Sequence, residues 1–66
     1  MYNDRLSREC KALKIKQYQL AKKVNVSEQT VSGWFNGLYL PSDKNEKKLL
    51  ELDITLKAIR NVPEES

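Results

Sequence analysis

The sequence predicts an all-α domain of four or five short helices. Apolar residues recur three and four positions apart along most of the chain, which is the period of one helix face. Residues that favour helix ends, mainly Ser, Asn, Asp and Gly, separate these stretches. The 66 residues suffice for one domain. We expect it to span residues 1–61, with a frayed tail over 62–66.

The first helical stretch follows the Asn3-Asp4 pair, of which either residue can cap a helix. Leu6, Cys10 and Leu13 lie at i, i+4 and i+7, on one helix face. Residues 14–16 interrupt this spacing, so we expect the first helix to end before them.

The second stretch runs from Gln17 to Val24 and places Leu20 and Ala21 on the same side as Val24. Asn25 follows. Because Asn tolerates left-handed backbone better than other non-glycine residues, Asn25 is expected to end this helix tightly.

The third stretch contains "TVSGWFNGLYLP", residues 30–41, which has two interpretations. Its strand-forming residues and its Asn36-Gly37 pair fit a β-hairpin. However, the alternation of a hairpin is missing, whereas Val31 and Trp34 share one face of a helix capped by Ser27. We therefore predict a helix that ends at the Asn36-Gly37 pair.

Residues 42–61 are also helical in pattern, either as one continuous helix, which we favour, or as two helices divided at Asp53. The stretch carries two apolar stripes. One comprises Leu49, Leu52, Leu56 and Ile59 and is assigned, through its first three members, to the core of the chain. The other comprises Leu50, Ile54 and Ala58 and is assigned to a partner subunit.

Composition excludes several classes of protein. No apolar run approaches the roughly 20 residues of a membrane span, and no signal peptide is recognisable. With one cysteine and no histidine, we expect no disulfide within the chain and no metal site. With no histidine, the sequence offers no plausible pair of nucleophile and base. Its one cysteine, Cys10, has the spacing of a small core residue. We expect neither a cofactor nor a small-molecule ligand, and a cytoplasmic location.

Positive charge is concentrated in the first half of the chain. Residues 1–38 contain seven Lys or Arg and three Asp or Glu, whereas residues 39–66 contain five Lys or Arg and six Asp or Glu. This asymmetry favours a polyanionic partner that contacts the first half.

Residues 17–36, "QYQLAKKVNVSEQTVSGWFN", resemble the helix-turn-helix of the phage repressor and Cro family. Gln17 opens the motif, Ala21 is small where the two helices cross, and Asn25 stands in the turn. Val31 and Trp34 occupy the buried positions of the recognition helix. The resemblance covers residues 3–52 and implies a lambda-repressor-like fold and double-stranded DNA as the partner.

Two positions depart from the family pattern. Many members join the first and third helices by an Arg–Glu pair, and the corresponding residues here are Cys10 and Phe35. Both are apolar, so neither leaves a charge unpaired. The loop over residues 38–42 also lacks the basic residues that many members place there.

The polar face of the third helix is expected to enter a major groove. Candidate base-reading residues are Glu28, Gln29, Ser32 and Gly33. Of these, Gln29 can pair bidentately with adenine, and Gly33 leaves room for a base or a thymine methyl group. Candidate phosphate contacts are Lys16, Gln17, Ser27, Asn36 and Lys44.

These residues predict a sequence-specific transcriptional regulator. The resemblance implies a dimeric Cro-like repressor or autoregulator in a phage or bacterium, with Leu50, Ile54 and Ala58 joining the homodimer. The alternative is an antitoxin or a protein-docking adaptor that reuses the fold.

Overall fold

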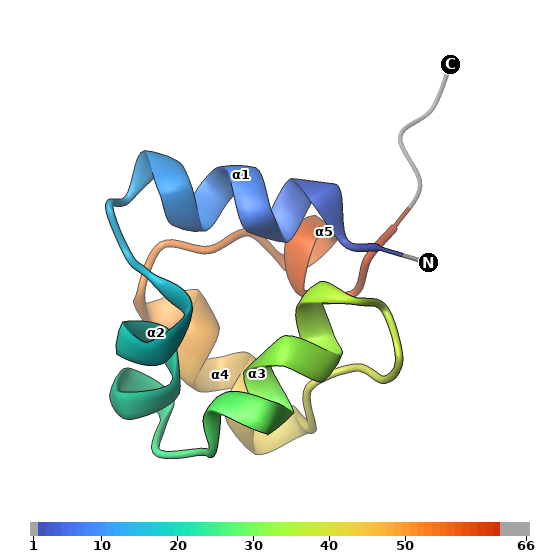
Figure 1. Ribbon diagram of the computed structural model, residues 1–66. Helices are drawn as coiled ribbons and strands as arrows, with labels where there is room; N and C mark the ends of the chain where they lie inside the picture. Colours follow the sequence, from blue (N-terminus) through green and yellow to red (C-terminus); the bar gives the residue numbers. More distant parts are fainter. Residues whose placement is uncertain (1, 63–66) are drawn as a thin grey trace.

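The protein is described here from a computed structural model, which covers residues 2–62 and has five α-helices in that range (Figure 1). They are α1 (Asp4–Ala12), α2 (Gln17–Val24), α3 (Glu28–Phe35), α4 (Asp43–Glu51) and α5 (Leu56–Ile59). The predicted all-α class is confirmed. The hairpin considered for residues 30–41 is wrong, because the first half of this stretch lies in α3.

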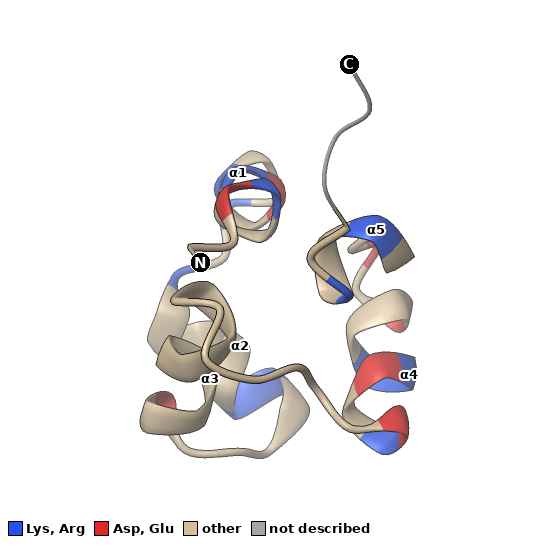
Figure 2. Cartoon of the chain, turned by 90° about the vertical axis from the view of Figure 1, so that its right-hand side faces the viewer, with Lys and Arg blue, Asp and Glu red and all other residues tan. Residues whose placement is uncertain are grey.

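The helices enclose one small core. In Figure 1, α1 lies across the top, α2 and α3 lie together below it, and α4 with α5 closes the far side. Figure 2 shows the same arrangement along the axis of α1. The core side chains, all buried, are those of Leu6, Cys10, Leu20, Ala21, Val24, Val31, Trp34, Leu49, Ile54, Ala58 and Ile59.

The predicted continuous helix over residues 42–61 is wrong. The helix capped by Ser42 ends at Glu51, and a second one begins at Leu56 after Thr55, whose hydroxyl accepts from the Ala58 N–H. Asp53 ends α4 in a left-handed conformation, with φ of 70°, and does not cap α5. The break reorients the chain so that residues from both apolar stripes reach the core.

The assignment of the two stripes is corrected accordingly. Ile54 and Ala58, expected at a dimer interface, are buried in the core of their own chain. Leu56, expected in the core, is 40% exposed, as is Leu50 at 42%. Of the three residues assigned to a partner subunit, Leu50 alone remains accessible.

All five described helices end in the same way. At each end, a residue with positive φ is followed by an apolar residue, and the two N–H groups bond back to carbonyls of the last turn. This is the Schellman motif. The pairs are Lys14-Ile15, Asn25-Val26, Gly37-Leu38, Asp53-Ile54 and Asn61-Val62. Val62, predicted to be frayed, is therefore bonded to the Lys57 carbonyl; the rest of the predicted tail lies outside the described residues.

Asn3 is a fully buried polar residue that connects three helices. Its side-chain oxygen accepts from the Leu6 N–H at 3.0 Å, so Asn3 is the one of the two candidate residues that caps α1. Its side-chain nitrogen donates to the Ala58 carbonyl of α5 at 2.6 Å. Its backbone N–H donates to the Phe35 carbonyl at the end of α3, also at 2.6 Å.

The four-residue helix α5 is held by two further side chains. The Glu9 carboxylate of α1 accepts from the N–H and the hydroxyl of Thr55, at 2.8 and 2.7 Å. Arg60 donates twice to the Glu46 carboxylate of α4, and this interaction holds the pKa of Glu46 below its usual value. These contacts stabilise a helix too short to form alone.

Cys10 and Phe35 are the two positions at which the resemblance to the repressor and Cro family implies an ion pair, and both are apolar. They line the same surface hollow, with Cys10 buried and Phe35 half-buried against the core. Burial, and to a lesser extent the negative charge of Glu9, raises the pKa of the Cys10 thiol to about 11. The cysteine is therefore a neutral thiol at neutral pH.

We expect Asn3→Ala to lower the free energy of unfolding by about 2–3 kcal/mol, because it removes both a helix cap and a buried hydrogen bond to the Ala58 carbonyl, which then keeps only the Asn61 N–H as a donor. Urea unfolding followed by circular dichroism measures this change. The matched control is Ser42→Ala, which removes an exposed cap that bonds only within α4 and should cost about 1 kcal/mol. Equal losses in the two variants would contradict the connecting role of Asn3.

We expect native Cys10 to react with iodoacetamide far more slowly than the urea-unfolded chain at pH 8, since burial disfavours the reactive thiolate. Mass spectrometry over time gives both rates. Phe35→Ala should open the hollow and speed the native reaction. Labelling of the native wild type at the unfolded rate would contradict the burial of this thiol.

Candidate nucleic-acid interface

One face of α3 is polar and accessible along its whole length. Val31 and Trp34 point inward and are buried, and this fixes the rotation of the helix. Glu28, Gln29 and, just after the helix, Asn36 are exposed on the other side, with Ser32 half-buried between them. Four of the predicted contact residues therefore lie together on one surface.

Hydrogen bonds order two parts of this face. The Asn36 side chain donates to the Ser32 hydroxyl at 3.2 Å, one turn away. Because that oxygen accepts from Asn36, the hydroxyl hydrogen of Ser32 must go to another acceptor. At the start of the helix, the Ser27 hydroxyl accepts from the Thr30 N–H and bonds the Thr30 hydroxyl at 2.9 Å. Ser27 thus has the cap role that the sequence predicted.

Gly33 is not the open position that was expected. It is buried beneath the side chain of Tyr39, and a Cβ added to Gly33 would overlap the end of the Tyr39 ring. No base or methyl group can approach the Gly33 backbone while the ring is there. The physical reason is the turn at Gly37, which directs the following loop back over α3.

The start of α2 provides a cluster of N–H donors. Lys16 precedes the helix in an extended conformation and makes no side-chain cap bond, since an ammonium group has no acceptor. The Gln19 side chain accepts from the Lys16 N–H at 2.8 Å. Gln17 is exposed at the first helical position. Helix N-termini of this kind attract phosphate through their N–H groups and their dipole.

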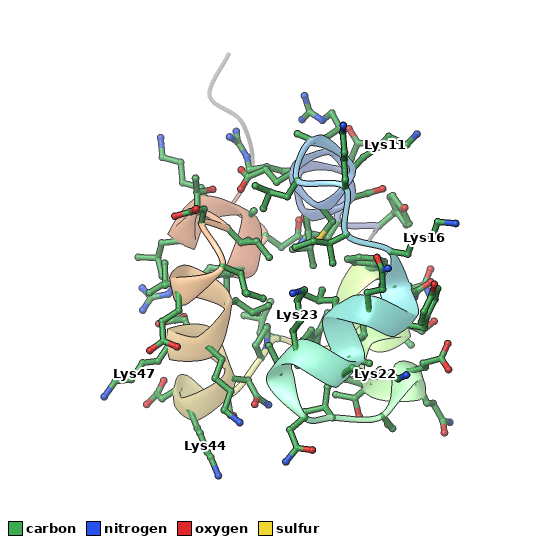
Figure 3. The ribbon with its side chains drawn as sticks, turned by 90° about the vertical axis from the view of Figure 1, so that its left-hand side faces the viewer. Lys11, Lys16, Lys22, Lys23, Lys44 and Lys47 are labelled. Carbon is green, nitrogen blue, oxygen red and sulfur yellow. The ribbon has the colours of Figure 1, made fainter. Side chains whose placement is uncertain are left out.

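Three lysines surround this helix start. Lys11, Lys14 and Lys16 line the hollow beside Cys10 and Phe35, which measures about 480 Å³ and also includes Gln17. We call Lys11, Lys14 and Lys16 the basic corner. Of these three lysines, only Lys16 was predicted from the sequence to contact phosphate, although the spacing "KALKIKQ" before α2 was a signal for all three. In Figure 3, Lys11 and Lys16 lie toward the same edge of the molecule.

The other charges are distributed differently. Glu28 is the one charged residue of α3, and the loop from Asn36 to Ser42 has none. On α4, acidic and basic residues alternate along the surface (Figure 2). Lys44, the remaining predicted phosphate contact, is exposed in the first turn of α4 and lies in Figure 3 on the side away from Lys16. The structure does not bring Lys44 together with the basic corner.

Two features of residues 2–62 concern membranes and metal ions. No helix among residues 2–62 is long and apolar enough to cross a membrane. The same residues contain no group of three His, Cys, Asp or Glu that could hold a metal ion.

The connection between α2 and α3 decides the family. The two helices pack closely and are joined by a tight turn in which Asn25 has φ of 60°, as the sequence predicted. A family model described as helix-turn-helix matches residues 6–53, most of the chain. The chain belongs to the Cro-like helix-turn-helix family. No curated protein and no solved structure matches the chain.

Membership in the helix-turn-helix family makes this chain a DNA-binding regulator of the Cro and C1 type, and the family is not one of enzymes. It also gives the elements their roles. The helix α3 is the recognition helix, and α2 is the helix that precedes it. In such a motif the recognition helix enters the major groove of double-stranded DNA.

Proposed function

We propose that this protein is a sequence-specific repressor or autoregulator, encoded by a bacterium or a phage, that binds a double-stranded operator in the bacterial cytoplasm. The observation that carries the proposal is the recognition helix itself. Its apolar side is buried, so its polar side, with Gln29 at the centre, is held in one orientation. A fixed row of polar side chains on a helix is what reading base edges in a major groove requires.

In this proposal the polar face of α3 selects the sequence. Gln29 pairs with adenine through its amide, and Ser32 offers a hydroxyl that Asn36 orders. Glu28 accepts from a cytosine amino group, since its carboxylate would repel phosphate. Ser27 and Asn36, at the two ends of α3, lie where the groove walls bring phosphates close.

Attraction to the phosphates comes from a different place. The basic corner and the N–H groups at the start of α2, including that of Gln17, hold one strand of the backbone. Lys44 is a more distant cation that contributes through the general field of the molecule. Binding is therefore salt-dependent mainly through residues outside the recognition helix.

The proposal includes a homodimer on DNA. One recognition helix reads a single half-site, and two-fold dimers of this class read two half-sites one helical turn apart. With Ile54 and Ala58 buried, the candidate surface is now Leu50 together with Leu56, the two exposed leucines of α4 and α5. Such a surface is small, so we expect a dimer that forms mainly on the operator.

A protein-docking role is the second candidate, and two observations favour it. The recognition helix carries a net negative charge, and the uncharged loop after it exposes Leu38 and Leu40. An antitoxin or adaptor could use both against another protein. Binding to duplex DNA that weakens steeply with salt distinguishes the operator from this alternative.

We expect Gln29→Ala to weaken binding to the selected site by about 1–3 kcal/mol and to relax one base position. Lys16→Ala should weaken binding to all duplexes about equally and should lower the salt slope by about one unit. Selection from random duplexes, followed by titrations at several salt concentrations, measures both effects. An unchanged site preference in Gln29→Ala would show that Gln29 does not read a base.

We expect Leu50→Lys to remain folded but to lose operator affinity, because the new charge lies at the proposed dimer surface. The control is Glu51→Gln, which changes the net charge by the same amount at the next position. Analytical ultracentrifugation with and without operator DNA gives the stoichiometry. If the wild type binds its selected site as one chain per duplex, the homodimer is excluded.

A further inference from the structure

The loop after the recognition helix returns toward the helix that it leaves. The Gly37 N–H bonds the Trp34 carbonyl at 3.2 Å, and the Leu38 N–H bonds the Gly33 carbonyl at 2.9 Å. These two bonds and the positive φ of Gly37, 73°, reverse the chain direction at the end of α3. Tyr39 follows directly and is therefore placed beside α3.

Tyr39 lies on Gly33 and contacts a neighbouring residue of the same helix. The three atoms nearest to a Cβ built on Gly33 all belong to the Tyr39 ring and its hydroxyl. The hydroxyl donates to the Gln29 carbonyl at 3.3 Å. The side chain is still 47% exposed, so it covers the helix while remaining part of its outer surface.

The Tyr39 ring lies beside the position from which Gln29 is proposed to read a base. Gln29 and Gly33 are four residues apart, so they lie one above the other on the helix. Gln29 is the principal base-reading residue of the proposed function. A side chain at residue 33 would project next to it, but glycine has none, and the end of the Tyr39 side chain occupies that space instead.

We propose that Tyr39 acts as the missing side chain of residue 33 and reads a base next to the one read by Gln29. This inference rests on the proposed DNA-binding function. It makes Tyr39 a specificity-determining residue that comes from outside the recognition helix.

The hydrogen bond of Tyr39 defines what it can read. A phenol has one hydrogen to donate, and here that hydrogen goes to the Gln29 carbonyl. The oxygen can then act only as an acceptor for a further partner. A phosphate oxygen cannot donate, so it is not that partner. The donors on base edges in the major groove are the amino groups of adenine and cytosine, so Tyr39 favours one of these two bases.

Gly33 and Tyr39 are a coupled pair in this arrangement. Any side chain at residue 33 would meet the ring and displace it. Gly33→Ala should therefore produce the same change in DNA preference as Tyr39→Ala, although residue 33 in the wild type has no side chain with which to touch a base.

The DNA experiment compares the full-length wild type with Tyr39→Phe, which keeps the ring and removes the hydroxyl. In selections from random duplexes, we expect Tyr39→Phe to lose the preference for adenine or cytosine at one position. The Gln29-dependent position should stay. Affinity for the wild-type site should fall about three- to tenfold, with the salt slope unchanged because no charge is altered. The control is Leu40→Ala, an exposed neighbour in the same loop, which should select the wild-type site.

A DNA-free experiment tests the coupled pair separately. Thermal unfolding is measured for Gly33→Ala in the wild type and in a Tyr39→Ala background. We expect the substitution to lower the melting temperature in the wild type, where it meets the ring. It should raise the melting temperature in the Tyr39→Ala background, where alanine is the better helix former. The same effect in both backgrounds would overturn the contact.

The outcomes separate this inference from the function on which it rests. If the wild type selects one site and Tyr39→Phe keeps the same preference, the role of Tyr39 is overturned but the proposed function is not. An equal loss of affinity for all sequences also overturns that role, since that result indicates a backbone contact. If the wild type selects no duplex at all, the proposed function fails, and the role of Tyr39 fails with it.

Discussion

The recognition helix, which is the proposed DNA-reading element, is joined to the rest of the fold by the hydrogen bonds of one buried residue, Asn3. Its side chain caps α1 and donates to a carbonyl of α5, while its backbone N–H donates to the carbonyl of the last residue of α3. The carbonyl of Phe35 would otherwise end the recognition helix without a partner from the helix itself. This bond joins the carboxyl end of α3 directly to the residue that caps α1, in addition to the burial of Val31 and Trp34.

A chain with helices of nine residues or fewer must stabilise them at their ends. The Schellman motifs do this at the carboxyl end, where each places an apolar residue after the left-handed one. Side chains from distant helices also stabilise helix ends: Glu9 accepts from Thr55 at the start of α5, and Lys48 donates to the Val24 carbonyl at the carboxyl end of α2. The same contacts that end the helices therefore also join them, and this gives a small core a defined shape.

The difference between local helix-end signals and contacts between distant helices explains what the sequence could predict. The first three helices were predictable because their signals are local: the spacing of Leu6 and Cys10, the cap at Ser27, and Asn25 in the turn. The break between α4 and α5 was not, because one long helix fits the same apolar spacing. The contact that favours the break joins Glu9 to Thr55, 46 positions apart. The candidate site shows the same contrast between local and distant signals. The polar face of α3 could be predicted from the spacing of its residues. That Tyr39 covers Gly33 depends on the path of a loop, which periodicity does not encode.

Cys10 and Phe35 stand where the resemblance to the repressor and Cro family implies an ion pair, and this affects how the salt dependence of DNA binding should be interpreted. With Cys10 and Phe35 at those positions, these two residues form no ion pair between α1 and α3 that salt could screen. The Cys10 thiol, with its pKa raised to about 11, also stays neutral in the pH range where DNA is bound. This apolar pair therefore gives the orientation of the recognition helix no salt dependence of its own. In the proposed function, the salt dependence of binding comes mainly from phosphate contacts of the basic corner. Affinity and selectivity are in this way assigned to separate elements, the lysines before α2 and the polar face of α3.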